Sequence, residues 1–310
     1  MTSLTIISYH YVRDLARSRY PLIKGRDISE FRAQLDYIGR TYTVVTAEQV
    51  CAAINGGDPL PPNGAWLTFD DGYLDHYVNV FPLLHERGWQ GSFFPPAAIM
   101  KGEILQVNKI HFVLASKVNV DAIIDDIRRF VEARREEANI RPFEQYWSEL
   151  AKTPRFDTVE VAFVKRMLQY ALPEAIREEL VDQLFARYVC VDSAAFAAEL
   201  YLTMDQLRTM NNSGMYIGCH GDKHHWLDRL NHACQAAEID RSLAFLKELG
   251  SQVDNWVMCY PYGAYNVDLL GILKTRGCTA ALTTRKGVAI LGEDRALELP
   301  RLDTNDLPIA

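Results

Sequence analysis

The sequence lacks the long apolar stretch that a membrane-spanning helix requires. No run of about 18 or more apolar residues occurs along the chain, so no transmembrane segment is expected. Its 6 cysteines form no C-x-x-C pair, which is typical of a protein with reduced thiols. Residues 1–10 hold no basic segment before their short apolar run, so we expect no signal peptide. We therefore expect a cytoplasmic location.

Basic residues are fewer than acidic residues. The chain has 33 Lys and Arg against 40 Asp and Glu, a formal net charge of −7. This acidic balance argues against nucleic acid or an acidic membrane surface as the main partner. Hydrophobic residues make up 48% of the sequence and charged residues 24%, an ordinary globular composition. The length of 310 residues suits one large α/β domain, or one domain with a substantial insertion.

Short apolar runs alternate with helical patterns over the first hundred residues, which predicts a parallel sheet, open or closed into a barrel. The expected strands of this part are residues 4–9, 43–45, 65–69 and 92–94. The expected helices are residues 28–39, 47–54 and 78–88. Long amphipathic segments then follow at 119–138, 157–171 and 173–188. The alternation returns near residue 216. We therefore predict a single domain over residues 1–310 with a helical insertion at 101–200, which is a candidate lid or homo-oligomer contact.

Two short segments far apart in the sequence carry the chemistry. The first reads LTFDDG at residues 67–72 and places two carboxylates at the end of an apolar strand. In α/β proteins, functional groups collect at the carboxyl ends of strands. The second reads HGDKH at residues 220–224 and spaces two imidazoles at i and i+4. On a helical turn, which we expect here, both imidazoles point the same way.

These side chains suit one divalent metal ion. Asp71, His220 and His224 provide one carboxylate and two imidazoles, with positions left for water and substrate. Zn²⁺ is the expected ion, and Co²⁺, Ni²⁺, Mn²⁺ and Fe²⁺ are alternatives. Asp70 is then a natural general base for the attacking water. The competing interpretations are a helix-capping Asp71 and an Asp70 that only orders the loop.

Both segments resemble the first two motifs of the polysaccharide deacetylase family, the NodB-homology carbohydrate esterases. That family's first motif is T-F-D-D-G, and its second is a closely spaced histidine pair. The sequence CYPYGAYN at residues 259–266 resembles the third motif. The resemblance covers roughly residues 1–100 and 200–305 and implies a distorted (β/α) barrel of about seven strands.

The resemblance also implies an activity, the metal-dependent removal of an N-acetyl (N-acyl) group from an amino sugar. Without an export signal, the expected substrate is an N-acetylated saccharide or a saccharide precursor. One alternative is a hydrolase of another non-peptide C–N bond, of the deformylase or cyclic amidase type. Another is a catalytically silent carbohydrate-binding protein that kept the fold.

Two further catalytic groups follow from the third motif and its departures from the family pattern. The resemblance assigns the backbone N–H of Tyr262 to the oxyanion of the tetrahedral intermediate, where the alternative is a simple turn. Cys259 stands where the family often has an arginine that orients the base. Arg301 is a candidate to supply that charge from the end of the chain, and a structural ion pair is the alternative.

The general acid is less clearly marked. The last histidine is His232, so the late catalytic histidine of many members is absent. His10, at the end of the first expected strand, is the candidate acid, although it also suits a loop-fixing or substrate-contacting role. His76 and His225 are weaker candidates. Gly221 stands where many members have Ser or Thr.

Overall fold

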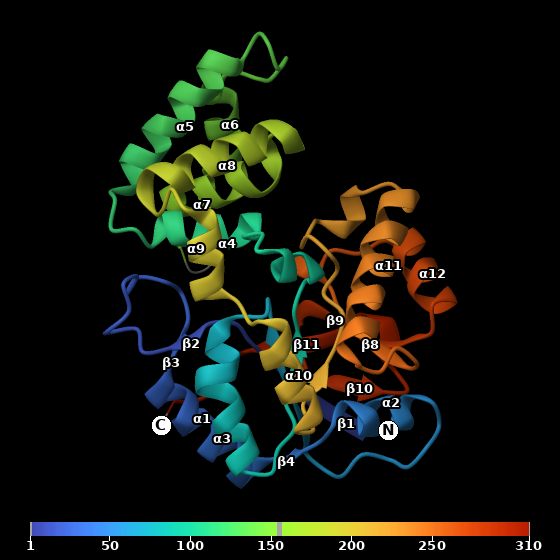
Figure 1. Ribbon diagram of the computed structural model, residues 1–310. Helices are drawn as coiled ribbons and strands as arrows, with labels where there is room; N and C mark the ends of the chain where they lie inside the picture. The colour runs from blue at the N-terminus through green and yellow to red at the C-terminus, as the bar shows by residue number, and fades with distance from the viewer. Residues whose placement is uncertain (1, 154–156, 310) are drawn as a thin grey trace. The chain divides into compact units, whose positions relative to one another are not determined.

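The structure is a computed structural model that describes residues 2–153 and 157–309 (Figure 1). The chain divides into two compact units, which we call the sheet unit and the helical unit. The sheet unit runs to Asp14, continues over Gly25–Glu103 and resumes at Ala197. The helical unit comprises Leu15–Lys24 and Ile104–Phe196.

Parallel strands form the centre of the sheet unit. Along the order β7-β6-β5-β1-β11-β9-β8, every pair of neighbours is parallel. These strands are β1 (Thr2–Tyr9), β5 (Gly64–Asp70), β6 (Ser92–Phe94), β7 (Tyr216–Ile217), β8 (Trp256–Cys259), β9 (Cys278–Lys286) and β11 (Leu299–Asp303). β5 is buried along its whole length, as expected of a central parallel strand. Four short strands complete the pairing: β4 (Thr43–Val44) joins β5, β10 (Ala289–Leu291) joins β1, and β2 (Val12–Arg13) pairs with β3 (Arg26–Asp27).

The two ends of this strand order meet. An isolated parallel bridge joins Cys219, just after β7, to Met258 of β8. The N–H of Cys219 donates to the carbonyl of Val257 at 3.0 Å, and the N–H of Cys259 donates to the carbonyl of Cys219 at 2.8 Å. The sheet of seven parallel strands therefore curls into a distorted (β/α) barrel, which confirms the predicted fold class.

Amphipathic helices cover the sheet. In α1, Asp27 caps the first turn and forms a capping box with Glu30, while Phe31, Leu35 and Ile38 face the core. Figure 1 shows α11 and α12 side by side. The helices of this unit are α1 (Ile28–Thr41), α2 (Ala47–Ile54), α3 (Phe81–Glu86), α10 (Met204–Asn212), α11 (His232–Leu249) and α12 (Val267–Thr275).

One expected helix differs in form. The segment predicted at 78–88 is a π-helical turn, His76–Val80, followed directly by α3. Pro82 lies in the first turn of α3 and has no N–H to continue an α-helical pattern from the preceding turn. The wider turn is therefore the local consequence of a proline inside an otherwise helical sequence.

The helical unit contains α4 (Gln106–Leu114), α5 (Val120–Arg134), α6 (Phe143–Leu150), α7 (Val159–Arg166), α8 (Glu174–Tyr188) and the start of α9 (Ser193–Leu200). The described residues between 101 and 200 form helices and no strand. Sequence analysis did not place Leu15–Lys24 here, where the ring of Tyr20 lies 5.1 Å from that of Phe112. The organisation as one domain over 1–310 with an insertion at 101–200 stays a prediction. Over the described residues, no helix combines the length and the hydrophobicity that crossing a membrane requires.

The aromatic packing of α1 against the sheet generates a stability prediction. The buried ring of Phe31 meets Tyr9 at 5.1 Å and Phe69 at 6.1 Å, both edge to face. Phe31→Ala should lower the free energy of unfolding by about 3–5 kcal/mol, because a buried aromatic ring leaves a cavity. Urea denaturation measures the loss. Val267→Ala is the control, since that side chain is 82% exposed and its loss should cost within about 0.5 kcal/mol. Equal stability of the two variants would contradict this core assignment.

Candidate active site

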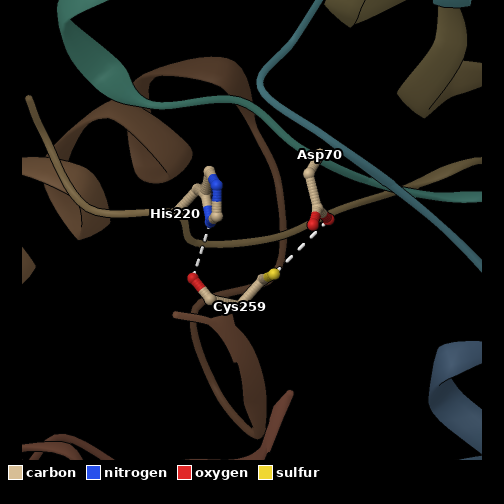
Figure 2. A group of neighbouring side chains, drawn as sticks. All are labelled: Asp70, His220 and Cys259. Carbon is tan, nitrogen blue, oxygen red and sulfur yellow. Dashed lines mark hydrogen bonds between the residues drawn. The ribbon is translucent and has the colours of Figure 1, made fainter. Parts of the chain in front are cut away.

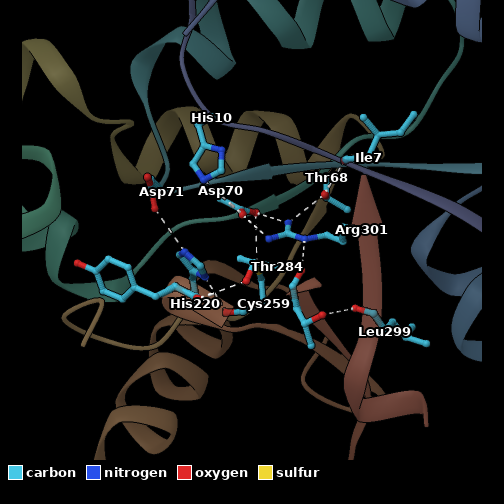
Figure 3. A network of polar contacts seen from close by, with 12 residues as sticks. Ile7, His10, Thr68, Asp70, Asp71, His220, Cys259, Thr284, Leu299 and Arg301 are labelled. Carbon is cyan, nitrogen blue, oxygen red and sulfur yellow. Dashed lines mark hydrogen bonds and ion pairs between the residues drawn. The ribbon is translucent and has the colours of Figure 1, made fainter. Parts of the chain in front are cut away.

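The carboxyl ends of the parallel strands lie at one edge of the sheet. Figure 3 shows five of the predicted site residues together there: His10, Asp70, Asp71, His220 and Arg301. β5 ends at Asp70 and is followed by Asp71, and β1 leads into His10. β8 ends at Cys259, and Arg301 lies within β11. The fold thus joins residues from both ends of the chain.

The two histidines of the second segment do not lie on a helical turn, so that prediction was wrong. Residues 220–224 form an irregular loop after Cys219. Gly221 has φ 74° and His224 has φ 58°, both in the left-handed region. This backbone path brings the rings of His220 and His224 to a centroid distance of 4.9 Å. A loop conformation that histidine seldom adopts, rather than helical spacing, makes the imidazoles converge.

Asp71, His220 and His224 form a compact buried group. Oδ1 of Asp71 lies 3.3 Å from Nε2 of His220 and 3.3 Å from Nε2 of His224. Among the described residues, no donor hydrogen-bonds to this buried oxygen. The three candidate ligand atoms lie within 4.8 Å of one another. An unsatisfied carboxylate oxygen facing two imidazole nitrogens fits one divalent ion.

Two outer contacts orient these groups. Nδ1 of His220 donates to the carbonyl of Cys259 at 2.6 Å (Figure 2). Because a carbonyl oxygen only accepts, the neutral ring carries its hydrogen on Nδ1 and turns the lone pair of Nε2 toward Asp71. The hydroxyl of Tyr73 donates to Oδ2 of Asp71. Sequence analysis missed Tyr73, although it directly follows the Asp-Asp-Gly segment.

The carboxyl group of Asp71 is held ionised. Burial opposes its ionisation, but the neighbouring imidazoles of His220 and His224 outweigh burial and hold its pKa well below the usual range. A carboxylate in this state is a ready metal ligand.

Asp70 is held by a buried arginine. Nη1 of Arg301 donates to Oδ1 of Asp70 at 3.0 Å, and Nη2 donates to Oδ2 at 2.8 Å. Arg301 is itself fixed by its Nε, which donates to the carbonyl of Thr283 at 2.9 Å, and by a 3.2 Å bond to the hydroxyl of Thr68. Burial opposes ionisation of Asp70, but the charge and hydrogen bonds of Arg301, together with the nearby His10 and His220, outweigh burial and hold the pKa of Asp70 well below its usual range. The catalytic role of Arg301 stays a prediction.

Cys259 lies between the base and the histidine. Its thiol donates to Oδ1 of Asp70 at 3.4 Å, as Figure 2 shows. Asp70, His220 and Cys259 are a second group with ligand atoms within 4.8 Å. Burial raises the pKa of the Cys259 thiol, which disfavours the thiolate that a metal requires, and both oxygens of Asp70 already bind Arg301. The group of Asp71, His220 and His224 therefore fits a metal better.

The candidate acids lie in different surroundings. Nε2 of His10 is 3.8 Å from Oδ2 of Asp70, and the His10 side chain is 44% exposed. His76 is buried instead, and its Nε2 donates to the carbonyl of His10 at 2.8 Å. Burial lowers the pKa of His76 to about 4, so its ring is neutral. Nδ1 of His225 lies 3.5 Å from Oε1 of Glu238. His10 is thus the histidine of these three beside the base.

The third motif forms a tight turn next to His224. Tyr262 has φ 59° in the 3₁₀ turn Pro261–Gly263, and its ring lies 4.7 Å from that of His224. Trp226 stacks on Tyr262 at 4.3 Å with an interplanar angle of 6°. A Cβ at Gly263 would lie 2.2 Å from the hydroxyl oxygen of Thr284, so only glycine fits this turn. The assignment of the Tyr262 N–H to an oxyanion stays a prediction.

Comparison with known proteins shows which proteins this chain is similar to. The family model described as polysaccharide deacetylase matches residues 180–281. Over this stretch the chain is similar to the polysaccharide deacetylase family, the family whose motifs the sequence resembles. A poly-beta-1,6-N-acetyl-D-glucosamine N-deacetylase of Escherichia coli (strain K12) is 38% identical over 90 residues. That match covers 29% of this chain and 13% of the E. coli protein, so the chain spans only a small part of this relative.

Solved structures share the fold. Deacetylase PplD of Streptococcus pyogenes, in complex with acetate, superposes with a TM-score of 0.60 at 17% identity, over 97% of this chain and 92% of that chain. A de-N-acetylase from Aggregatibacter actinomycetemcomitans gives 0.58 at 19% identity, over 97% and 95%. The BpsB deacetylase domain from Bordetella bronchiseptica gives 0.56 at 17% identity, over 97% and 95%.

The converging ligand atoms generate a metal-binding prediction. His220→Ala and His224→Ala should each bind Zn²⁺ far more weakly than the parent, because each removes one of three ligands. Metal analysis after dialysis, or competition with a chelating dye, measures the loss. His232→Ala is the control, since His232 is exposed at the start of α11. Full metal content in both ligand variants would rule out this ligand set.

Proposed function

We propose that this protein is a polysaccharide deacetylase of the matched family, a metal-dependent hydrolase that removes an N-acetyl group from an amino sugar of a polysaccharide or saccharide precursor. The observation that carries the proposal is the pairing of a buried ionised base, Asp70, with the adjacent group of Asp71, His220 and His224. The match to an enzyme named as an N-acetyl-D-glucosamine polymer deacetylase supports this substrate class.

Asp71, His220 and His224 would hold the ion, for which Zn²⁺ is the proposed identity and Co²⁺, Ni²⁺, Mn²⁺ and Fe²⁺ are alternatives. Such an ion lowers the pKa of a water molecule and polarises an amide carbonyl. Two hydrogen bonds orient the ligand side chains: the hydroxyl of Tyr73 binds Asp71, and the carbonyl of Cys259 binds His220.

Asp70 accepts the proton of the attacking water. Its carboxylate stays ionised and fixed in orientation because the two parallel hydrogen bonds from Arg301 hold both oxygens. The water oxygen bonds to the carbonyl carbon, the C–N bond breaks, and the products are acetate and a free amine. The amine nitrogen must gain a proton. His10 is the proposed donor, because its Nε2 lies 3.8 Å from Asp70 and its side chain is 44% exposed. The N–H of Tyr262 is the proposed donor to the oxyanion.

The complete set of base and ligand side chains favours an enzyme over a silent carbohydrate-binding protein. A hydrolase of another C–N bond would use the same groups, and acetate release distinguishes it. A cytoplasmic location and a homo-oligomeric state both stay predictions from the sequence.

Asp70→Asn should retain the metal and lose most of the hydrolysis. The amide nearly preserves the shape of the side chain but cannot take the proton, and general-base catalysis contributes about 10²–10⁴-fold in rate. Acetate release from N-acetylglucosamine oligomers, with and without a chelator, measures the effect. Asp205→Asn is the matched control, because that side chain is 92% exposed. Parental turnover by Asp70→Asn would move the base to another residue.

Arg301→Met should raise the acidic limb of the pH profile of kcat/KM. Burial raises the pKa of Asp70 and Arg301 is the strongest of the groups that lower it, so the pKa of Asp70 rises when Arg301 is lost. Asp70 must be ionised to accept a proton. As the pH is lowered, activity is therefore lost at a higher pH in the variant than in the parent. Arg295→Met, whose side chain is 83% exposed, should leave the profile unchanged. An acidic limb at the parental pH in Arg301→Met would contradict the role of Arg301.

A further inference from the structure

A buried carboxylate outside the site contacts the loop between the two histidines. Glu238 lies on α11, and its side chain is 2% exposed. Its Oε2 accepts hydrogen bonds from two successive backbone N–H groups, of Asp222 at 2.9 Å and of Lys223 at 3.0 Å. These two residues are the middle of the segment that joins His220 to His224. One oxygen of Glu238 therefore binds two backbone N–H groups of this loop.

The second oxygen of Glu238 is engaged as well. Nη2 of Arg241 donates to Oε1 at 3.0 Å, and Nδ1 of His225 lies 3.5 Å from the same atom. Nε of Arg241 also donates to the carboxylate of Asp222, whose side chain is 1% exposed. A single guanidinium thus bridges two buried carboxylates, one on the helix and one on the loop. This bridge offsets the cost of burying two like charges side by side.

Two backbone carbonyl groups of the loop accept hydrogen bonds from another segment of the sheet unit. The N–H of Ala97 donates to the carbonyl of Gly221 at 3.1 Å, and the N–H of Ala98 donates to the carbonyl of Asp222 at 3.0 Å. A Cβ at Gly221 would lie 3.2 Å from Oε2 of Glu238, closer than an ordinary contact. Glycine at this position leaves room for the carboxylate beneath the loop.

We propose that Glu238 is a positioning residue that holds the 220–224 loop in the shape that turns His220 and His224 toward Asp71, with Arg241 holding Glu238 in place. The proposal rests on the metal site of the proposed function. Two residues of the loop have positive φ, so the loop needs outside contacts to keep this path. Without Glu238, the imidazoles must be ordered when the ion binds, and the affinity falls.

The test compares Glu238→Leu and Glu238→Gln in the full chain. Glu238→Leu removes both acceptors, so Zn²⁺ affinity should fall about 10–100-fold, the range found for outer contacts of metal ligands. Glu238→Gln keeps one acceptor oxygen and should lose less. Competition with a chelating dye measures the affinity. Asp240→Asn, on the same helix with its side chain 56% exposed, is the control and should bind Zn²⁺ like the parent.

Amide hydrogen exchange of the metal-free protein gives a second readout that needs neither metal nor activity. The amides of Asp222 and Lys223 should exchange faster in Glu238→Leu than in the parent and in Asp240→Asn. If Glu238→Leu does not fold, Glu238→Gln and Arg241→Leu provide the same comparison. Affinity within twofold of the parent together with unchanged exchange would overturn the proposal. Failure of the parent to bind Zn²⁺, Co²⁺, Ni²⁺, Mn²⁺ or Fe²⁺ would instead refute the metal site. Amide exchange would still show whether Glu238 restrains the loop.

Discussion

The buried ion pair between Arg301 and Asp70 is the interaction on which the site depends. β11 and β5 lie on either side of β1, and the guanidinium reaches Asp70 from the last strand of the chain. Removing two charges from water is costly, and two further donors of Arg301 offset part of this cost by binding Thr283 and Thr68. The pair keeps the base ionised and fixes the end of β5.

That fixed strand end lets two adjacent aspartates serve different tasks. Asp70 is the last residue of β5, while Asp71 has φ 72° and therefore directs its carboxylate elsewhere, to the histidines. Gly72 follows at φ 70°, and a Cβ there would lie 2.6 Å from the side chain of Ile99. The Asp-Asp-Gly segment is thus a sharp turn out of a strand as much as a pair of acids, and glycine is required for packing.

The prediction of a helical turn at residues 220–224 was wrong. A spacing of i and i+4 is the signature of a helical turn, but Gly221 and His224 take left-handed conformations and the segment is irregular. Its shape comes from Glu238 and from the segment at Ala97, both remote in sequence. No local pattern in residues 220–224 encodes these partners, so the imidazoles converge for a reason that the sequence does not display.

The sequence by itself determined the class of fold and the chemical groups of the site. The alternating apolar runs define the parallel strands, and the strand-end carboxylates with the histidine pair mark the ligands, because burial and ligand chemistry act on residue type and short spacing. Only the tertiary structure decided which charge reaches Asp70, that the Cys259 thiol lies beside it, and that Tyr73 and Glu238 orient the groups around them. These contacts join segments distant along the chain or depend on left-handed backbone geometry, and both arise from the packing of the sheet unit as a whole.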